Sequence, residues 1–308
     1  MASISPSQVP VKKAKAARPQ WIDTLKQYGK HKGAVVSTII FFIIVLAVLI
    51  GPFFWTIDPN FSDLRARNQT PSLEHPFGTD NLGRDLFAAN LYGGRISIAV
   101  GLASMLVSIF IGTFIGLLAG YIKWLDGPLM RLTDMFFALP RLPLLLVVIM
   151  LYRESLRDVF GPELGIFLLI VFIIGATSWM TTARIVRGDV LSVKEREFVT
   201  AANALGSRNG RVLGLHILPN VLSPILVSAT LGMATAIITE SALSFLGLGF
   251  PSDVPTWGRL LFDGKDFLTL TPMRVVWPGL FISLIVLCVN FMGDGLRDAM
   301  DPRLRSKG

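Results

Sequence analysis

The stretch "EFVTAANALGSRNGRVLGLHILPN", residues Glu197–Asn220, lies between two segments that are apolar enough to cross a lipid bilayer. The stretch itself is too polar to enter the membrane, yet its apolar residues recur with the spacing of a helix. It is therefore more than a plain connecting loop. The sequence around it predicts a chain in which membrane spans flank a compact helical element outside the bilayer.

The composition of the whole chain supports a membrane protein. Of 308 residues, 52% are hydrophobic and 16% are charged, whereas soluble proteins carry about 25% charged residues. The single cysteine, Cys288, excludes an internal disulfide, and the three histidines lack metal-ligand spacing. The net charge of +8 is typical of basic residues on the cytoplasmic side of a membrane protein, so we expect no nucleic-acid partner and no metal.

The hydropathy pattern predicts an all-α, polytopic fold with six transmembrane helices. Each candidate is roughly 20 residues long, which is enough to cross about 30 Å of hydrocarbon. The candidates are Ala34–Trp55, Ser97–Tyr121, Met130–Tyr152, Ile166–Arg184, Val221–Leu246 and Val275–Met292. Within the second, Gly112, Gly116 and Gly120 share one helix face, where another helix can approach closely.

The distribution of Lys and Arg predicts the orientation. Nineteen of these residues lie in the two terminal tails, the loop after the second span and the segment around the quoted stretch, against nine in the alternate segments. The excess places both termini in the cytoplasm. The predicted organisation is a basic tail that contacts lipid (1–33), a first span with an extracytoplasmic segment (34–96), a core of five spans (97–293) that includes a cytoplasmic segment (185–220), and a C-terminal tail (294–308).

Within the cytoplasmic segment, the pattern predicts two short helices joined by a glycine turn. Ser192 and Glu195 have the spacing of a capping box, which predicts a helix that starts near Val193. An apolar stripe follows, formed by Phe198, Ala201, Ala202 and Leu205. Gly206 suits the left-handed position that ends the helix.

A second short helix is expected from Arg208 until Pro219 stops it. Periodicity alone leaves two interpretations of the pair of helices: an amphipathic connector on lipid headgroups, or a surface that docks in the groove of a protein partner. The small alanine face favours the protein partner.

The same segment resembles the cytoplasmic loop of permease subunits of binding-protein-dependent ABC importers. That loop has the pattern Glu-Ala-Ala, three residues, Gly, nine residues, Ile, one residue, Leu-Pro. Here Thr200, Ala201 and Ala202 fill the first positions, Gly206 follows after three residues, and Leu218 and Pro219 close the pattern. Thr200 replaces the glutamate and His216 the isoleucine, and Glu197, one turn earlier, is a candidate substitute carboxylate.

Four further stretches resemble the second permease subunit of dipeptide, oligopeptide and nickel importers. They are "HPFGTDNLGRDLFAANLYGGRIS" (His75–Ser97), "ESALSFLGLG" (Glu240–Gly249), "PTWGRLL" (Pro255–Leu261) and "NFMGDGLRDAMDP" (Asn290–Pro302). The resemblance implies a type I ABC importer permease fold in a bacterial inner membrane. It also implies a second, homologous permease subunit, two ATPase subunits and an extracytoplasmic substrate-binding protein as partners.

The resemblance further implies that Glu197, Thr200, Ala201, Ala202, Gly206 and Pro219 couple the permease to its ATPases. The chain has no phosphate-binding loop, so ATP and Mg²⁺ are expected on the partner ATPases. It also has no catalytic cluster of Ser, His and Asp, so no enzyme activity is expected. The implied cargo is a dipeptide or oligopeptide. The alternatives are nickel or another small solute in the same family, or a self-sufficient channel or secondary carrier.

Two ionisable residues fall inside the predicted spans. Arg141 lies in the third span between two prolines, and is expected either to face the translocation path or a gate, or to pair with a carboxylate of the partner permease. Glu240 lies late in the fifth span, near the outer face, and is expected to have a structural role or to lie beside a gate.

Overall fold

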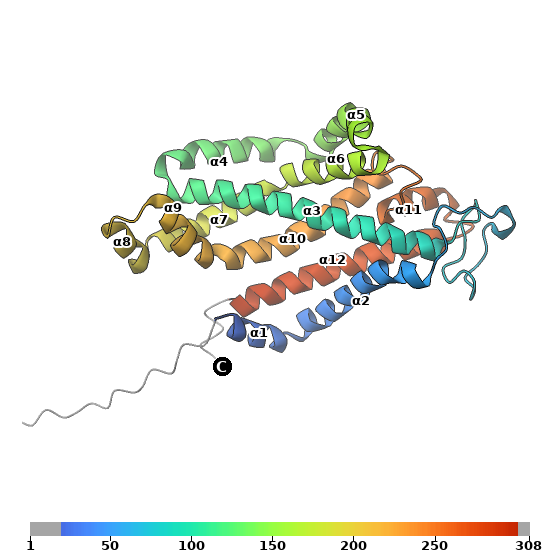
Figure 1. Ribbon diagram of the computed structural model, residues 1–308, viewed down its shortest axis with the longest axis horizontal. Helices are drawn as coiled ribbons and strands as arrows, with labels where there is room; N and C mark the ends of the chain where they lie inside the picture. Colours follow the sequence, from blue (N-terminus) through green and yellow to red (C-terminus); the bar gives the residue numbers. More distant parts are fainter. Residues whose placement is uncertain (1–19, 301–308) are drawn as a thin grey trace, which may run out of the picture.

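The computed structural model describes residues 20–300 of the chain, with side chains from residue 24 onward, as an elongated bundle of helices (Figure 1). The α-helices are α1 (Gln20–Lys30), α2 (Lys32–Phe54), α3 (Leu86–Tyr121), α4 (Lys123–Ala138), α5 (Arg141–Phe160), α6 (Pro162–Ala176), α7 (Trp179–Lys194), α8 (Glu197–Ala204), α9 (Asn209–Val212), α10 (Leu218–Phe245), α11 (Trp257–Gly264) and α12 (Met273–Met300). Short helices of other types span Leu64–Ala66, Leu213–Ile217 and Lys265–Phe267. The expectations for the first 19 and last eight residues of the two tails lie outside the described residues.

Four of the described helical segments are long and apolar enough to cross a membrane singly: α2, α3, α12 and the run from α9 to the end of α10. Two bent pairs, α4 with α5 and α6 with α7, pass the same criteria when each pair is taken together. The described chain thus has four candidate spans, or up to six if each bent pair is one span.

The third predicted span, Met130–Tyr152, is wrong as a single straight helix. α4 ends at Ala138, α5 begins at Arg141, and the two axes differ by 84°. Pro140 explains the break, because proline disfavours helical geometry at the residue before it and has no N–H to donate. Leu139 accordingly has an extended backbone, with ψ of 134°.

The fourth predicted span, Ile166–Arg184, is also broken. α6 and α7 meet at a 40° bend, where two hydroxyl side chains bond back to the preceding turn. Thr177 Oγ1 donates to the carbonyl of Ile173 at 2.7 Å, and Ser178 Oγ donates to that of Ile174 at 2.5 Å. Such bonds compete with the helical ladder and favour a bend.

The predicted glycine face of α3 is confirmed as the surface where another helix approaches. That helix is α7. A β-carbon built on Gly112 would lie 2.7 Å from the carbonyl oxygen of Trp179, and one on Gly116 would lie 2.7 Å from that of Ala183. The glycines therefore let the two backbones pack closer than any side chain would allow.

Two predicted boundaries fall inside helices. α3 begins at Leu86, eleven residues before the predicted start at Ser97, because the side chain of Asp85 accepts a hydrogen bond from the Ala88 amide and caps the helix. At the other end of the core, α12 continues without a break to Met300.

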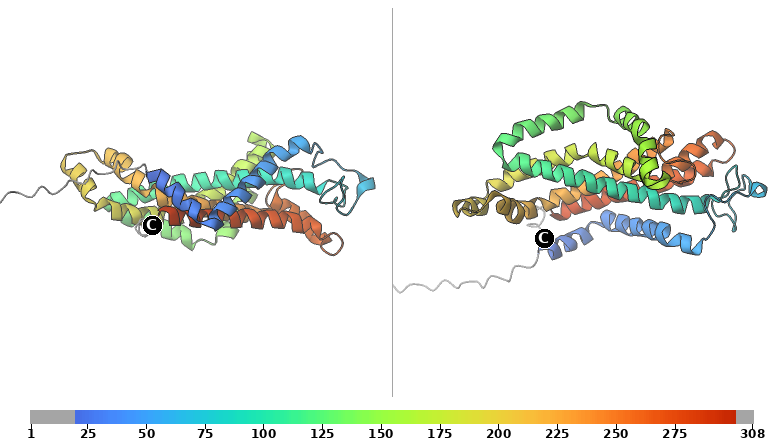
Figure 2. Two further views of the ribbon diagram at one scale, coloured as in Figure 1. Left: turned by 90° about the horizontal axis from the view of Figure 1, so that it is seen from below. Right: turned by 45° about the horizontal axis from the view of Figure 1, so that its top comes forward.

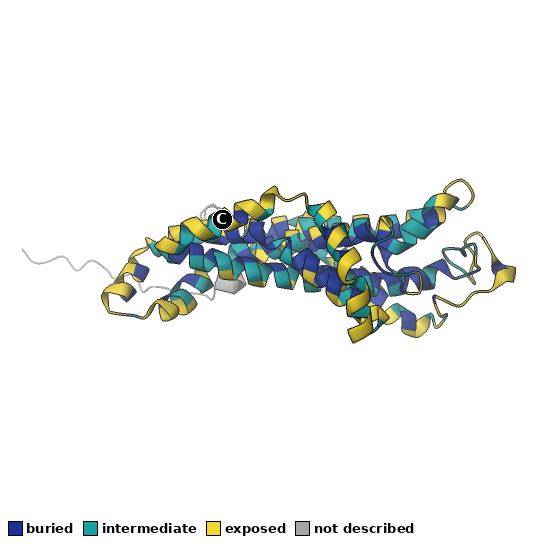
Figure 3. Cartoon of the chain, turned by 90° about the horizontal axis from the view of Figure 1, so that it is seen from above, coloured by how far each residue is buried: buried dark blue, intermediate teal, exposed yellow. Residues whose placement is uncertain are grey.

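The segment predicted to be extracytoplasmic and α8 occupy opposite ends of the bundle. Figures 1 and 2 show residues 55–85 as a folded loop at one end and α8 with α9 at the other. Buried residues follow the middle of the bundle, whereas the α8 end is largely exposed (Figure 3). α1 was not predicted from the sequence; it packs beside α12, and the hydroxyl of Tyr28 lies 2.5 Å from that of Thr38 on α2.

Candidate functional site

The cytoplasmic element predicted from the sequence forms an elbow, residues 195–217, between α7 and α10. The predicted helix start near Val193 is wrong. Ser192 and Val193 belong to the last turn of α7, and α8 begins at Glu197 after an extended Arg196. Burial explains the difference, because Val193 packs with other valines of α7 in an apolar cluster and so prolongs that helix past the capping box.

The predicted role of Gly206 in ending α8 is confirmed. Its φ is +78°, in the left-handed region that glycine adopts without strain. The Gly206 amide donates to the carbonyl of Asn203 at 2.9 Å, and the Ser207 amide donates to that of Ala202 at 3.1 Å. These two bonds form a Schellman cap, which fixes the direction in which the chain leaves α8.

The predicted helix stop at Pro219 is wrong. The chain passes from α9 through a π-helical turn into α10, and Pro219 lies in the first turn of α10. The Leu218 amide bonds to the carbonyl of Leu213, five residues earlier. This wider turn accommodates a proline, which has no N–H and would crowd the carbonyl four residues before it in a regular α-helix.

α8 has one buried face and one exposed face. Val199 and Ala202 are buried against the apolar cluster beneath the elbow. Phe198, Ala201 and Leu205 of the predicted stripe are exposed, with 87% of Leu205 accessible. Of the predicted coupling residues, Glu197, Thr200, Ala201, Gly206 and Pro219 are exposed and Ala202 is buried. Glu197 and Thr200 lie one turn apart on α8, whereas Pro219 belongs to α10.

The elbow is fastened to the end of α3. The hydroxyl of Tyr121 donates to the side-chain oxygens of Asn203 and Asn209, at 3.4 and 3.2 Å. The ammonium of Lys194 donates to the Tyr121 carbonyl at 2.8 Å. These contacts, with the apolar cluster, attach the elbow to α3, α7 and α10. The role of Tyr121 was not predicted from the sequence. Its two asparagine partners lie about 80 residues away, so no local sequence pattern indicates the contact.

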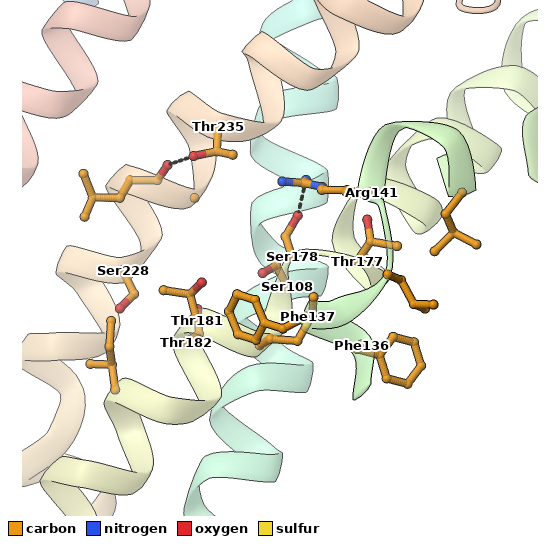
Figure 4. Close-up of a pocket in the computed structure, with 16 residues that line it drawn as sticks. Ser108, Phe136, Phe137, Arg141, Thr177, Ser178, Thr181, Thr182, Ser228 and Thr235 are labelled. Carbon is orange, nitrogen blue, oxygen red and sulfur yellow. Dashed lines mark hydrogen bonds between the residues drawn. The ribbon is translucent and has the colours of Figure 1, made fainter. Parts of the chain in front are cut away.

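The same three helices line a cavity of 220 Å³ further along the bundle. Ser108 comes from α3, Thr181 and Thr182 from α7, and Ser228 and Thr235 from α10. Arg141 and the breaks in both bent pairs complete the wall (Figure 4). A displacement of the elbow therefore acts on the helices that line the cavity.

Arg141 is the only charged residue among those that line this cavity. It is the first residue of α5, directly after the break at Pro140, and its guanidinium points toward α7 (Figure 4). Its Nη2 donates to the hydroxyl oxygen of Ser178 at 2.6 Å. Arg141 thus joins the two helix breaks.

Glu240 lies away from the cavity wall and is completely buried in α10. Its carboxylate accepts hydrogen bonds from three serine hydroxyls: Ser244 at 2.8 Å, Ser97 at 3.3 Å and Ser241 at 3.5 Å. Ser97 belongs to α3 and also accepts from the amide of Trp257 at 3.2 Å. The carboxylate therefore holds α10, α3 and the start of α11 together, and the predicted place beside a gate stays a prediction.

Replacement of Glu240 by alanine is expected to destabilise the protein by about 2 kcal/mol or more, because three buried hydroxyls lose their acceptor and a void remains. Glu240→Gln keeps one acceptor oxygen and the volume, so it should retain most of the stability. Thermal unfolding of the purified chain in detergent measures the stability of both variants. Equal stability of the alanine variant and the wild type would show that the serine contacts contribute nothing.

Comparison with known proteins identifies the family of the chain. Residues 108–306 match the family of binding-protein-dependent transport system inner membrane components, and residues 19–71 match the N-terminal transmembrane domain of oligopeptide transport permease C. The chain therefore belongs to the inner membrane components of binding-protein-dependent transport systems, and it is a permease subunit of an ABC importer.

Two similar proteins are permeases of peptide transport systems. The dipeptide transport system permease protein DppC of Alkalihalophilus pseudofirmus is 38% identical over 98% of this chain and 96% of its own length. The oligopeptide transport system permease protein OppC of Bacillus subtilis is 37% identical over 92% of this chain and 90% of its own. Both relatives are peptide-transport permeases, the class of subunit that the sequence resembles.

A solved structure of the MetNI methionine ABC transporter in an inward-facing conformation shares the fold. Its TM-score is 0.53, at 15% identity, over 68% of this chain and 95% of that one. The resemblance to an importer permease, predicted from the sequence, is confirmed by the family and its relatives.

Proposed function

We propose that this chain forms, with a second homologous permease, the translocation path of a peptide importer, and that ATPase subunits drive it through the elbow. The observation that carries the proposal is the exposed face of α8, formed by Phe198, Ala201 and Leu205, on an element fastened to three helices of the cavity wall. A continuous apolar face that is exposed on an element outside the membrane is typical of a surface that a protein partner covers.

The proposed mechanism is alternating access. Closure of the ATPases displaces α8, and the Schellman turn at Gly206 transmits the displacement because its two hydrogen bonds fix the exit from the helix. α3, α7 and α10 then move together, since all three are fastened to the elbow. ATP and Mg²⁺ are bound by the ATPase subunits, and this chain supplies no catalytic group.

The proposed topology has six spans in a bacterial inner membrane, with both termini and the elbow in the cytoplasm. Each bent pair then counts as one span. The excess of Lys and Arg at the elbow end supports this orientation. An extracytoplasmic binding protein delivers the solute to the opposite end, where residues 55–85 lie.

The proposed solute is a dipeptide or oligopeptide, because the two relatives named above are permeases for dipeptides and oligopeptides. The cavity wall suits such a solute: it offers hydroxyl groups and one guanidinium beside apolar side chains.

Reconstitution into proteoliposomes tests the proposal. We expect uptake of a labelled peptide when both permeases, the ATPases and the loaded binding protein are present with ATP. We expect none when the ATPases are omitted or when ATP is replaced by a non-hydrolysable analogue. Uptake by this chain without any ATPase would favour a self-sufficient carrier and would refute the proposal.

A further inference from the structure

We propose that the cavity beside Arg141 is a subsite that binds a carboxylate of the transported peptide. The inference rests on the proposed function, because it assigns chemistry to the path through which that peptide moves. In this proposal, Arg141 discriminates among solutes inside the permease, after the binding protein has delivered them.

The charge of Arg141 lacks a partner of opposite sign among the described residues. No ion pair found there includes it, and no carboxylate lines the cavity. Its one hydrogen bond goes to the neutral hydroxyl of Ser178, and its buried Nε has no acceptor. A guanidinium has five N–H donors, so most of them stay available to a ligand.

The two arginines of α7 differ from Arg141, because each of them is paired with a carboxylate. On α7, Arg187 makes two hydrogen bonds to the carboxylate of Asp126, and Arg184 lies 2.5 Å from that of Asp134. Both of these pairs join α7 to α4. Charges within membrane-embedded segments are normally paired or face a functional cavity, and Arg141 meets the second condition.

Hydroxyl groups surround Arg141 in the cavity wall. Thr177 and Thr235 each donate a hydrogen bond to a carbonyl of their own helix, at 2.7 and 2.9 Å. Both residues line the cavity, and because their hydroxyl hydrogens are already donated, their oxygens can only accept further hydrogen bonds. Figure 4 shows Thr235 across the cavity from the guanidinium. The wall thus combines a guanidinium donor for a carboxylate with hydroxyl oxygens that can accept from N–H groups, a combination that the end of a peptide matches.

The size and position of the cavity also suit part of a peptide. Its volume of 220 Å³ is below the roughly 300–1,000 Å³ of pockets that hold a whole small ligand, so it suits one residue of a longer solute. α5 begins at Arg141, so the positive end of its helix dipole adds to the charge of the side chain. Half-helix ends of this kind hold anionic solute groups in other transporters.

The test uses the complete importer in proteoliposomes, with the binding protein saturated so that its own affinity drops out of the comparison. Three peptides are compared: one with a free C-terminal carboxylate, its C-terminal amide, and an amide that carries a glutamate side chain as its last residue. The variants are Arg141→Gln, Arg141→Lys and, as a matched control on the same helix, Arg157→Gln. Arg157 is partly exposed, pairs with Glu154 and lies outside the cavity wall.

We expect Arg141→Gln to lower uptake of the free acid by about tenfold or more, since it loses a charge-assisted hydrogen bond. Uptake of the plain amide should change less than about twofold, Arg141→Lys should retain much of the preference, and Arg157→Gln should behave as wild type. If the glutamate-bearing amide follows the free acid, the subsite accepts any carboxylate; if it follows the plain amide, the subsite requires the terminal one. Both results support the proposal.

Equal loss for all three peptides would overturn the proposal, because Arg141 would then serve the structure or pair with a carboxylate of the partner permease. Unchanged uptake of the free acid in Arg141→Gln would overturn it as well. These results are distinct from failure of the proposed function, in which the wild-type complex moves none of the peptides.

Discussion

Replacement of Gly206 by valine is expected to reduce ATP-driven uptake by about tenfold or more, although the chain still inserts into the membrane. The φ of +78° at Gly206 is strongly disfavoured for a β-branched residue and costs about 1–2 kcal/mol or more. No atom lies within 4 Å of a β-carbon built at this position, so the loss comes from the backbone and not from a clash. The turn would relax, and α8 would no longer meet its partner in the same direction.

The matched control is Gly206→Asn, because asparagine adopts the left-handed conformation more readily than other residues with a side chain. It should keep most of the uptake at equal membrane levels. If the valine variant transports as wild type does, or if asparagine is as damaging as valine, then the left-handed turn does not carry the coupling.

Replacement of Gly116 by alanine is expected to lower the stability of the folded chain by about 1–3 kcal/mol. Its β-carbon would lie 2.7 Å from the carbonyl oxygen of Ala183 and 2.8 Å from Cβ of Val186, so α3 and α7 would have to separate. The fraction of folded protein that remains after heating in detergent measures this effect. Because α3 and α7 also carry the elbow and line the cavity, uptake should fall together with stability.

Gly232 offers the matched control for the glycine face. It lies in the apolar part of α10, and the atom nearest to a β-carbon built there is Cγ of Met105, at an ordinary 3.7 Å. Gly232→Ala should therefore leave stability close to that of the wild type. If Gly116→Ala and Gly232→Ala lose similar amounts of stability, the close approach of α3 and α7 does not explain the effect at Gly116.

Those features of the fold that depend on local chemistry could be predicted from the sequence. Uninterrupted apolar segments predicted α2 and α12 to within a few residues at most ends, and the spacing of Gly112, Gly116 and Gly120 predicted a close helix contact. Gly206 was predicted as a left-handed cap because few other residues suit that conformation.

The bends could not be predicted from length and hydropathy, because prolines are common in membrane helices that stay continuous. Pro140 breaks its helix by 84°, whereas Pro219 is accommodated by a π turn in a helix that continues. The difference lies in the surrounding packing. The capping box at Ser192 failed for a similar reason, since burial of Val193 outweighed a local hydrogen-bond pattern.

The candidate site was predicted in part. Helical spacing predicted an apolar stripe on α8, but not that Ala202 within it would be buried while the other three residues stay exposed. Arg141 was recognised as a charge in a membrane segment. Its place at the junction of two broken helices could not be recognised, because its contact with Ser178 joins residues 37 positions apart. The serine partners of Glu240 were missed because Ser97 is 143 residues away along the chain.

In the proposed mechanism, the ATPases act on this chain through the elbow, which lies on the cytoplasmic side of the membrane. Thiol labelling tests it most directly, in a chain whose only cysteine, the buried Cys288, is replaced by serine. Leu205 on the elbow and Leu73 in the outer loop, 87% and 99% exposed, are then changed to cysteine one at a time. We predict that a membrane-impermeant reagent labels Leu205→Cys only from the cytoplasmic side and Leu73→Cys only from the outside, and that Leu205→Cys cross-links to an ATPase subunit in the active importer. Labelling of Leu205→Cys from the outside, or an active importer in which it never cross-links to an ATPase, would contradict the account.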